Sequence, residues 1–458
     1  GVKNAVFVSW AITTVIFFIS GSLPSTFAAA LIAALANTLS ILMIIFGAVF
    51  LYQVMDQNGF IQRIQDSLQT IHPDRSFRFF FLALFLTAFF ESVAGFGTPG
   101  AIVPLLLVAL GYSPVLSIAT VLLLDGCFAM TGAIGTPMIA GLELPLALEG
   151  ETVSSTYQIA ATGVLLSGLI AMGFIYRALN RESQEKPTRQ GWILFLALLI
   201  PYVATIAFLR ELAGLVAPIL MVLFAFAFLF QERKLQLKPW FPYHLLVGLL
   251  LLPKLIPPFA DFLTWKLEIS SLFGTGVSAS LQPLRSPLIP FLVAGAFALS
   301  TCPQRQFDFQ PVLKKTIAVF LILFPSLAIT QLMIHSGGRF PSMVDSITLV
   351  FAQAGPAYPL FSPMIGIIGS FLTGSTTVSN VVFGPVQLQA AQTLEYPLEV
   401  ILGLQLAGAS IGNAICLFNI IAAAAVVGLQ NYAPILKRNL LPVILGSLAC
   451  SLLGYLLL

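Results

Sequence analysis

Two acidic side chains lie inside long apolar stretches of the sequence. Glu91 belongs to the stretch 77–94, and Asp125 belongs to the stretch 114–132. A charged residue at the centre of a membrane costs about 2.5–3.5 kcal/mol, and such residues commonly mark ion or proton pathways. Because burial favours the protonated form of a carboxyl group, either acid could carry a proton near neutral pH. Either could instead ligate Na⁺ together with carbonyl groups of a broken helix.

Glu91 precedes a polar, glycine-rich segment that interrupts its apolar stretch. The segment 91–99 contains Gly95, Gly97 and Thr98, and it ends in Pro99, which lacks the N–H group of a continuous helix. The segment 373–380 is similar and carries hydroxyl and amide side chains. A helix broken at membrane depth presents free N–H groups and a positive dipole end, which attract an anion. These segments therefore predict a site for a small carboxylate.

Two further interruptions, 132–137 and 408–413, follow the first pair in the sequence. We expect all four to converge on one central site. The alternative is that the glycine, serine and threonine residues only let helices pack closely. The predicted substrate-binding residues are Gly95, Gly97, Thr98, Thr136, Ser375, Thr376, Thr377, Ser379, Asn380 and Asn413, and the predicted proton carriers are Glu91 and Asp125.

The composition identifies lipid as the main solvent of the chain. Hydrophobic residues make up 58% of the 458 residues and charged residues only 9%, whereas soluble proteins carry about 25% charged residues. This excludes cytosolic enzymes, nucleic-acid binders and secreted disulfide scaffolds. The four cysteines, Cys127, Cys302, Cys416 and Cys450, have no metal-site or disulfide spacing and are predicted to be thiols. We find no nucleotide-binding loop, metal cluster or nucleophile–base pair, so we predict neither an enzyme nor a bound cofactor.

Long apolar runs predict an all-α polytopic membrane protein of about 12–14 segments, because a crossing helix needs about 20 mostly apolar residues. The first run, 5–19, is expected to be a membrane helix rather than a secretion signal, since many spans follow it. The predicted spans are 4–20, 26–54, 77–94, 114–132, 158–177, 191–209, 212–230, 241–257, 285–302, 312–334, 357–372, 396–415 and 438–457, with shorter stretches at 96–110 and 376–394.

Basic residues predict the orientation of the chain in an inner or plasma membrane. They cluster in loops at 177–189 (including Lys186), 233–238 (Arg233, Lys234 and Lys238) and 305–315 (Arg305, Lys314 and Lys315), and two spans separate each loop from the next. The positive-inside rule places these loops in the cytoplasm, with the basic residues of 63–78 and 437–438. The acidic loop 143–151 is then outside, the N-terminus inside and the C-terminus outside.

Two parts of the chain resemble each other at an offset of about 278 residues. The segment from Met55 to Leu68 resembles that from Met333 to Ile347, and Ala133–Thr136 resembles Ser410–Asn413. These two segments contain the loops of Gly59 and Gly337, and the predicted topology places the two loops on opposite sides of the membrane. We therefore predict two inverted repeats, 1–180 and 285–458, joined by membrane helices in 181–284 (about four). Inverted repeats with broken helices are typical of secondary transporters.

The segments 90–99, 106–111, 132–137, 333–337 and 372–387 resemble the L-lactate permease family. The resemblance is strong over about 90–140 and 330–430. It implies a proton-coupled importer of lactate, glycolate and related 2-hydroxy monocarboxylates. The chain departs from the family where Thr376 replaces a usual Asp, Asn413 a usual Lys, and Ser92 a common Gly. If the acid and the base form an ion pair in relatives, the loss of both together is electrostatically consistent, because a single buried charge without its partner is costly.

The sequence therefore predicts a secondary transporter that imports a small 2-hydroxy monocarboxylate by proton symport and alternating access. The partners expected are the small organic anion and lipid, with a homo-oligomer possible and no nucleic acid. One alternative keeps the architecture but couples to Na⁺ or carries another small anion. Another is an uncoupled anion facilitator.

Overall fold

The computed structural model describes residues 2–68, 72–95, 97–182, 188–230, 238–256, 263, 265–281, 283–284, 286, 288–301 and 307–458. Lys186, Arg233, Lys234, Cys302 and Arg305, which the sequence analysis names, lie outside these ranges, as does Phe96. The described part is almost entirely helical. This confirms the all-α class.

The helices before residue 183 are α1 (Val2–Ile19), α2 (Pro24–Gln57), α3 (Phe60–Leu68), α4 (Arg75–Ala94), α5 (Thr98–Ala109), α6 (Pro114–Phe128), α7 (Gly132–Met138), α8 (Leu144–Leu146) and α9 (Gly150–Glu182). The middle of the chain forms α10 (Gln190–Leu209), α11 (Ala213–Phe228), α12 (Phe241–Leu255), β1 (Leu267–Ile269) and β2 (Ala279–Leu281). The remainder forms α14 (Leu288–Thr301), α15 (Gln310–Ile334), α16 (Met343–Ala352), α17 (Tyr358–Thr373), α18 (Thr376–Thr393), α19 (Leu398–Gly412), α20 (Leu417–Val426) and α21 (Ala433–Leu457).

Seven helical stretches in the described part are long and apolar enough to cross a membrane. Four shorter apolar helices accompany them, so the predicted number of 12–14 segments stays a prediction. One of the seven, 190–228, turns at Arg210, where φ is 51°, and divides into α10 and α11, which pack against each other. The chain is therefore an integral membrane protein built from helices.

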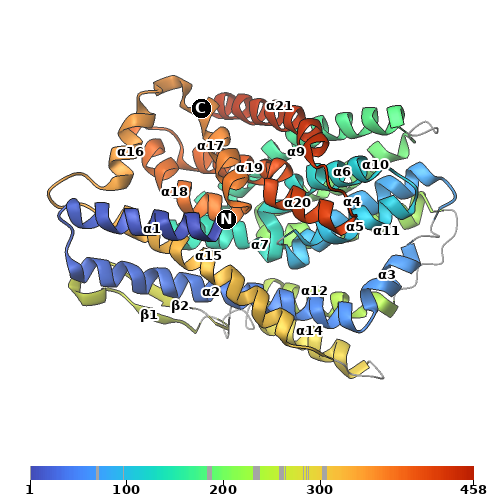
Figure 1. The fold of residues 1–458 in the computed structure, drawn as a ribbon, viewed down its shortest axis with the longest axis horizontal. Coiled ribbons are helices and arrows are strands. Elements are labelled where there is room, and N and C mark those ends of the chain that lie inside the picture. The colour runs from blue at the N-terminus through green and yellow to red at the C-terminus, as the bar shows by residue number, and fades with distance from the viewer. Residues whose placement is uncertain are drawn as a thin grey trace.

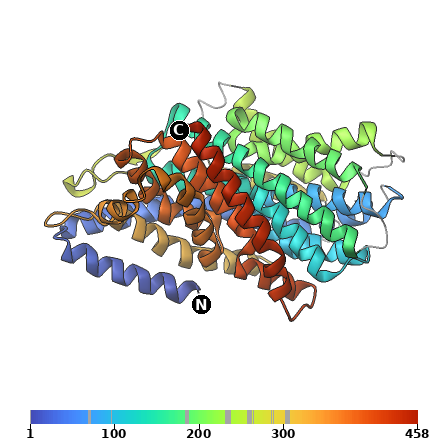
Figure 2. The same ribbon diagram turned by 90° about the horizontal axis from the view of Figure 1, so that it is seen from above.

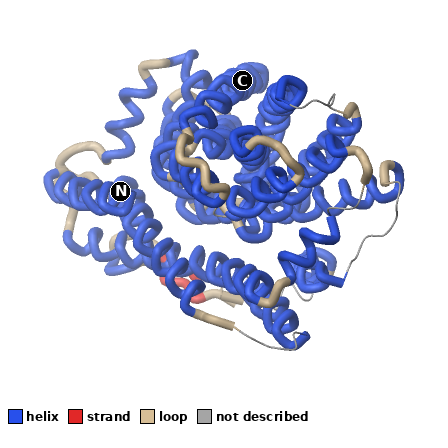
Figure 3. The backbone as a smooth tube through the Cα atoms, turned by 45° about the vertical axis from the view of Figure 1, so that its right-hand side comes forward, coloured by secondary structure: helices blue, strands red, loops and turns tan. Residues whose placement is uncertain are grey.

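The helices form two groups, visible in Figure 1. The lower group comprises α1, α2, α12, α14 and α15, with the antiparallel pair β1–β2 packed on α2. The upper group comprises α4 to α11 and α17 to α21. Apolar side chains of α2, α15 and α18, among them Val49, Leu327 and Val381, pack where the groups meet. Figure 3 shows how little strand the molecule contains.

The predicted number of about four helices in the middle of the chain stays a prediction, because several residues of 231–264 lie outside the described part. The described residues of the middle form three helices and then the short hairpin β1–β2. Between the strands, Leu272 and Val277 pack on Ala29 and Ala33 of α2. Glycine and serine residues in 270–276 interrupt the apolar sequence there, so this segment forms turns.

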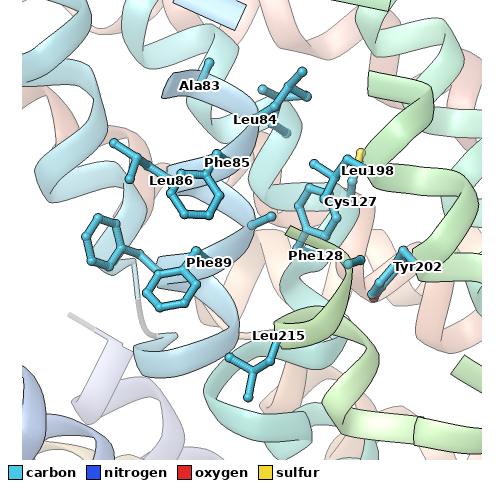
Figure 4. Close-up of a cluster of buried hydrophobic side chains, with 14 of the residues drawn as sticks. Ala83, Leu84, Phe85, Leu86, Phe89, Cys127, Phe128, Leu198, Tyr202 and Leu215 are labelled. Carbon is cyan, nitrogen blue, oxygen red and sulfur yellow. The ribbon is translucent and has the colours of Figure 1, made fainter. Parts of the chain in front are cut away.

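Aromatic side chains fix α4 inside the upper group. Figure 4 shows Phe85 and Phe89 of α4 near Phe128 of α6, Tyr202 of α10 and Leu215 of α11. All five side chains are buried. This packing holds the end of α4 that carries Glu91 away from lipid.

Helices α4 and α5 form a hairpin whose two ends meet. The Nε group of Arg75, at the start of α4, donates a hydrogen bond to the carbonyl oxygen of Leu110, just after α5, at 2.7 Å. Helices α17 and α18 form a second hairpin, whose ends meet where the hydroxyl of Tyr396 donates to the carbonyl oxygen of Gly355 at 3.5 Å. Each pair therefore enters the molecule and returns to the end from which it came.

The two hairpins enter from opposite ends of the long helix α21. Near its start, Arg438 pairs with Glu182, which also accepts a hydrogen bond from Ser113 beside the α4–α5 ends. Near its finish, the hydroxyl of Tyr455 donates to the carbonyl oxygen of Pro356, at the α17–α18 ends. Seventeen helical residues separate Arg438 from Tyr455, about 25 Å along the axis. Figure 2 shows α21 crossing the upper group.

Contacts between loops agree with the predicted grouping of the basic segments. Thr188 donates its N–H to Ser76 at 3.0 Å, and Asp308 donates its N–H to Gln57 at 2.8 Å. The side of the membrane that each end faces stays a prediction. The order of hairpin, interrupted helix and long helix occurs in both halves, and the inverted relation of the complete halves also stays a prediction.

Candidate functional site

The tip of the α4–α5 hairpin is a glycine turn. Gly95 has φ 55° and ψ −153°, a conformation that only glycine adopts readily, and Gly97 is left-handed with φ 76°. A β-carbon on Gly95 would lie 2.9 Å from the backbone nitrogen of Ala133. Thr98 and Pro99 begin α5, so the predicted break is confirmed. The glycines let this tip rest directly on α7.

The break after α6 is strongly bent. Ala133, Ile134 and Gly135 are consecutive left-handed residues, with φ values of 43°, 54° and 73°. A β-branched residue such as Ile rarely adopts this conformation, and each strained residue costs about 1–3 kcal/mol. Complete burial of Ala133 and Ile134 holds the turn in place. The structure confirms the predicted interruption at 132–137.

The tip of the α17–α18 hairpin presents the N-terminus of a helix. Gly374 is left-handed, and the Oγ of Ser375 caps α18 by accepting a hydrogen bond from the N–H of Val378 at 3.3 Å. The first turn of α18 contains Thr376 and Thr377, whose backbone N–H groups have no acceptor within the helix. This tip therefore carries the partial positive charge and the hydroxyls that the sequence predicts.

The fourth interruption lies later than predicted. Helix α19 continues through Gly408 to Gly412, and the break is a 3-10 turn at Asn413–Ile415 followed by extended Cys416. A β-carbon on Gly408 would collide with the backbone of Pro363, and one on Gly412 with the backbone of Ile367. These glycines let α19 approach α17, which is the close-packing role that the sequence analysis held as the alternative.

All four interruptions contribute to one cavity, whose enclosed space is about 40 Å³. The described residues that line it are Glu91, Gly95, Gly97, Ala129, Gly132, Ala133, Thr136, Pro137, Gly374, Ser375, Thr376, Thr377, Asn413 and Asn419. The lining is formed mainly by small and polar residues, so it is not blocked by large apolar side chains. Seven of the ten predicted substrate-binding residues are among them.

Three predicted substrate-binding residues lie outside the lining. Thr98 is buried at the start of α5. Ser379 donates its hydroxyl to the carbonyl oxygen of Gly366 at 2.8 Å, and the amide of Asn380 donates to the carbonyl oxygen of Pro137 at 3.1 Å. Gln405 of α19 donates to both Ser379 and Asn380. These contacts hold α18 against its neighbours. Ser379 and Asn380 therefore stabilise the position of the α17–α18 tip and do not face the cavity.

The hydroxyl groups of the lining differ in whether they already make hydrogen bonds within the protein. Thr376 donates to the carbonyl oxygen of Ala409 at 3.3 Å, and Thr136 donates to that of Ala133 at 2.8 Å. Ser375 accepts a bond from its own helix. Within the described part of the chain, the hydroxyl of Thr377 makes no hydrogen bond that would compete with a guest in the cavity.

The two membrane acids lie close together. Glu91 is 5% exposed and Asp125 is 2% exposed, and their carboxyl groups interact with each other. Oε2 of Glu91 and Oδ1 of Asp125 are buried and accept no hydrogen bond from the described residues. Gly132 leaves the room that Glu91 occupies, because a β-carbon there would collide with Oε1 of Glu91. The pair therefore has two oxygens that a proton can bridge.

One residue that the sequence analysis did not assign to the site joins it, and the charge of a second residue acts on it. Asn419 lies in the first turn of α20, and its amide donates to Oδ1 of Asn413 at 2.7 Å; the amide of Asn413 donates to Oδ2 of Asp125 at 2.8 Å. The charge of Lys315 on α15 acts on Glu91. A polar residue just after a helix break was a usable signal for Asn419. Lys315 gave none, because its sequence position suggested only a cytoplasmic loop.

The positions that depart from the resembled family have separate hydrogen-bond partners. Thr376 contacts the backbone of α19, whereas Asn413 contacts Asp125. The described residues contain no group of three His, Cys, Asp or Glu side chains able to hold a metal ion. None of the three described cysteines forms a disulfide. The cavity thus offers hydroxyls, amides, a helix N-terminus and a carboxyl pair, with no catalytic nucleophile–base arrangement.

Comparisons with known proteins identify the family. The family model for L-lactate permease matches residues 2–458. A relative from Haemophilus influenzae, to which the same family name is given, is 27% identical over 93% of this chain and 88% of the relative. The L-lactate permease of Streptococcus iniae is 26% identical over 77% of this chain and 78% of that protein, and that of Escherichia coli is 25% identical over 84% and 78%. With its membrane helices, this chain belongs to the L-lactate permease family of transporters and is not an enzyme.

Proposed function

We propose that this protein imports a small 2-hydroxy monocarboxylate, such as lactate or glycolate, by proton symport and alternating access. The observation that carries the proposal is a polar cavity at the tips of two hairpins that enter from opposite ends. A substrate held there can be reached from either side of the membrane if the hairpins move in turn. The family and the relatives named L-lactate permease support the class of substrate.

The substrate carboxylate fits the N-terminus of α18. Backbone N–H groups of the first turn and the hydroxyl of Thr377 offer hydrogen bonds there, and the helix dipole favours a negative charge. The amide groups of Asn413 and Asn419 offer polar partners for a 2-hydroxyl group across the cavity. This arrangement binds an anion without an Arg or Lys in the lining.

Charge balance is the reason for coupling to protons. An anionic substrate in the cavity would lie near Glu91, which lines it, and near Asp125 behind. Like charges this close in a buried site repel strongly, so a proton on the carboxyl pair removes a large penalty. Among the described residues, Lys315 is the cation whose charge acts on Glu91. The proton and the substrate anion then cross the membrane together without net charge.

Reconstituted vesicles test the coupling directly. We expect an inward pH gradient to drive lactate above its equilibrium distribution without Na⁺. A requirement for Na⁺ would instead support the sodium-coupled alternative, in which the acids ligate the cation. Uptake that never exceeds equilibrium under either gradient would support the uncoupled facilitator and contradict the proposal.

Replacement of Glu91 tests the proton carrier. Glu91→Gln keeps the shape but cannot release a proton, so we expect the loss of gradient-driven accumulation while lactate exchange between the two sides partly persists. Glu149→Gln, at an exposed acid distant from the lining, is the matched control and should accumulate lactate normally. Normal accumulation by Glu91→Gln would remove Glu91 from the mechanism.

A further inference from the structure

Two amide side chains connect the cavity to the buried acid pair. Asn413 and Asn419 both line the cavity. Asn419 donates to Oδ1 of Asn413 at 2.7 Å, and Asn413 donates through Nδ2 to Oδ2 of Asp125 at 2.8 Å. The carboxyl group of Asp125 also interacts with that of Glu91. A continuous chain of polar groups thus connects the cavity with both carboxyl groups.

The bonding pattern sets the roles of the two acids. Because Asn419 occupies the oxygen of the Asn413 amide, the nitrogen of that amide must point at Asp125. An amide N–H only donates, so Oδ2 of Asp125 is the acceptor of this bond. A hydrogen bond to the ionised form stabilises it. The bond from Asn413 therefore favours the carboxylate form of Asp125. With this bond in place, the exchangeable proton belongs on Glu91 or between the two acids.

We infer that Asn413 and Asn419 are positioning residues that couple substrate occupancy to protonation of the Glu91–Asp125 pair. This inference rests on the proposed function. A substrate anion in the cavity competes for the amide N–H groups of Asn413 and Asn419. When Asn413 turns toward the substrate, Asp125 loses its donor and takes a proton from water to replace it. Binding of the substrate anion is therefore accompanied by protonation of the Glu91–Asp125 pair.

The surroundings of the pair add few competing groups. From α15, the charge of Lys315 acts on Glu91. From α6 itself, the thiol of Cys127 lies near Asp125 and donates to the carbonyl oxygen of Leu123 at 3.7 Å. Glu211, in the α10–α11 turn, packs against Gly135 of α7. Among the described groups that face the pair, Asn413 is therefore the neutral donor that can turn away without moving a charge.

The test measures protons taken up when purified protein binds L-lactate. Binding is followed by titration calorimetry, and proton uptake by a pH indicator in weakly buffered detergent solution. We expect wild-type protein to take up protons with lactate. The ratio of protons to bound lactate should fall by about half or more in Asn413→Ala, and less in Asn419→Ala, because the coupling free energy between the two events is reduced.

Asn439→Ala is the matched control. Asn439 is a buried amide that donates to the carbonyl oxygen of Ala414, in the same turn as Asn413, but it has no bond to this chain of polar groups. Loss of structure alone would lower affinity in all three variants without changing the ratio. We expect Asn439→Ala to keep the wild-type ratio. If Asn413→Ala does not fold, Asn419→Ala provides the test, because the Asn419 amide donates to Asn413 and makes no contact with Asp125.

The outcomes separate this inference from the proposed function. Lactate binding by wild-type protein without proton uptake would contradict proton symport itself. Proton uptake by wild-type protein with an unchanged ratio in both variants would leave symport standing and overturn the role of the amides. A lowered ratio in Asn439→Ala as well would also overturn it.

Discussion

Individual hydroxyl groups of the α18 segment have different roles, although they are neighbours in the sequence. Ser375 and Thr377 belong to the tip and line the cavity. Ser379, one helical turn after Ser375, is about 6 Å further along the axis and bonds to the backbone of α17. Sequence composition marks the whole segment as polar. Which hydroxyls face a guest depends on the helices packed around them.

Thr377→Val tests the hydroxyl that is available to the substrate. The change keeps the side-chain shape and removes the hydroxyl, so a bond to a charged carboxylate worth about 1.5–3 kcal/mol is lost. We expect the dissociation constant for lactate to rise about ten-fold or more, since about 1.4 kcal/mol is a factor of ten. Titration calorimetry measures it.

Thr393→Val serves as the control for the same change. Thr393 lies exposed at the other end of α18, where its hydroxyl donates to the carbonyl oxygen of Gln389. It should bind lactate with wild-type affinity. Wild-type affinity in Thr377→Val as well would move the carboxylate subsite away from the start of α18.

At the scale of the elements, glycine residues with similar sequence surroundings have different physical functions. Gly132 makes room for the mobile end of a side chain, Oε1 of Glu91. Gly408 makes room for backbone, because α19 touches Pro363 of α17 there. Only the first is in a break, so the sequence pattern alone placed the fourth interruption too early.

Gly132→Ala should displace the carboxyl group of Glu91 while leaving the helices in place. We therefore expect a small change in thermal stability but a clear loss of pH-driven lactate accumulation. Gly408→Ala should instead destabilise the protein by about 1–3 kcal/mol or more, because rigid backbone cannot move aside. Thermal unfolding in detergent and vesicle uptake measure the two effects.

Gly173→Ala is the reference for both changes. A β-carbon there meets no atom within 4 Å, inside helix α9. Stability and uptake should match those of the wild type or improve slightly, since alanine favours a helix over glycine by up to about 1 kcal/mol. Normal accumulation by Gly132→Ala would show that the position of the Glu91 carboxyl group does not matter.

At the scale of the whole molecule, two hairpins approach one cavity from opposite ends. The pair α4–α5 begins and ends beside Glu182, and the pair α17–α18 begins and ends beside Tyr455, at the other end of α21. This opposition at the hairpins is what inverted repeats require. The alternating access that we propose would use one hairpin on each side of the membrane to close over the cavity.

Cysteine labelling tests this opposition in intact cells. In a chain without its own cysteines, Arg181→Cys marks the end of α4–α5, and Gln392→Cys marks the end of α17–α18; both positions are exposed. The positive-inside rule predicts that an impermeant maleimide added outside labels Gln392→Cys only. Arg181→Cys should react after the membrane is made permeable. Labelling of both in intact cells would contradict opposite entry.

The sequence by itself determined the membrane class, the family resemblance and the helix interruptions at 91–99, 132–137 and 373–380. These depend on local properties: apolar length, and glycine or proline at positions where a helix cannot continue. The polar character of the site was also local, because Glu91, Asp125 and the 375–377 hydroxyls are unfavourable in lipid unless they serve a cavity or a partner.

Only the tertiary structure decided which of these residues meet. The bond from Asn413 to Asp125 joins residues 288 positions apart, and the approach of Lys315 to Glu91 depends on how the lower group packs on the upper group. Gly408 and Gly412 proved to be contact surfaces because α17 lies against them. Such pairings follow from packing between distant helices, and a helix pattern carries no information about the partner that covers each face.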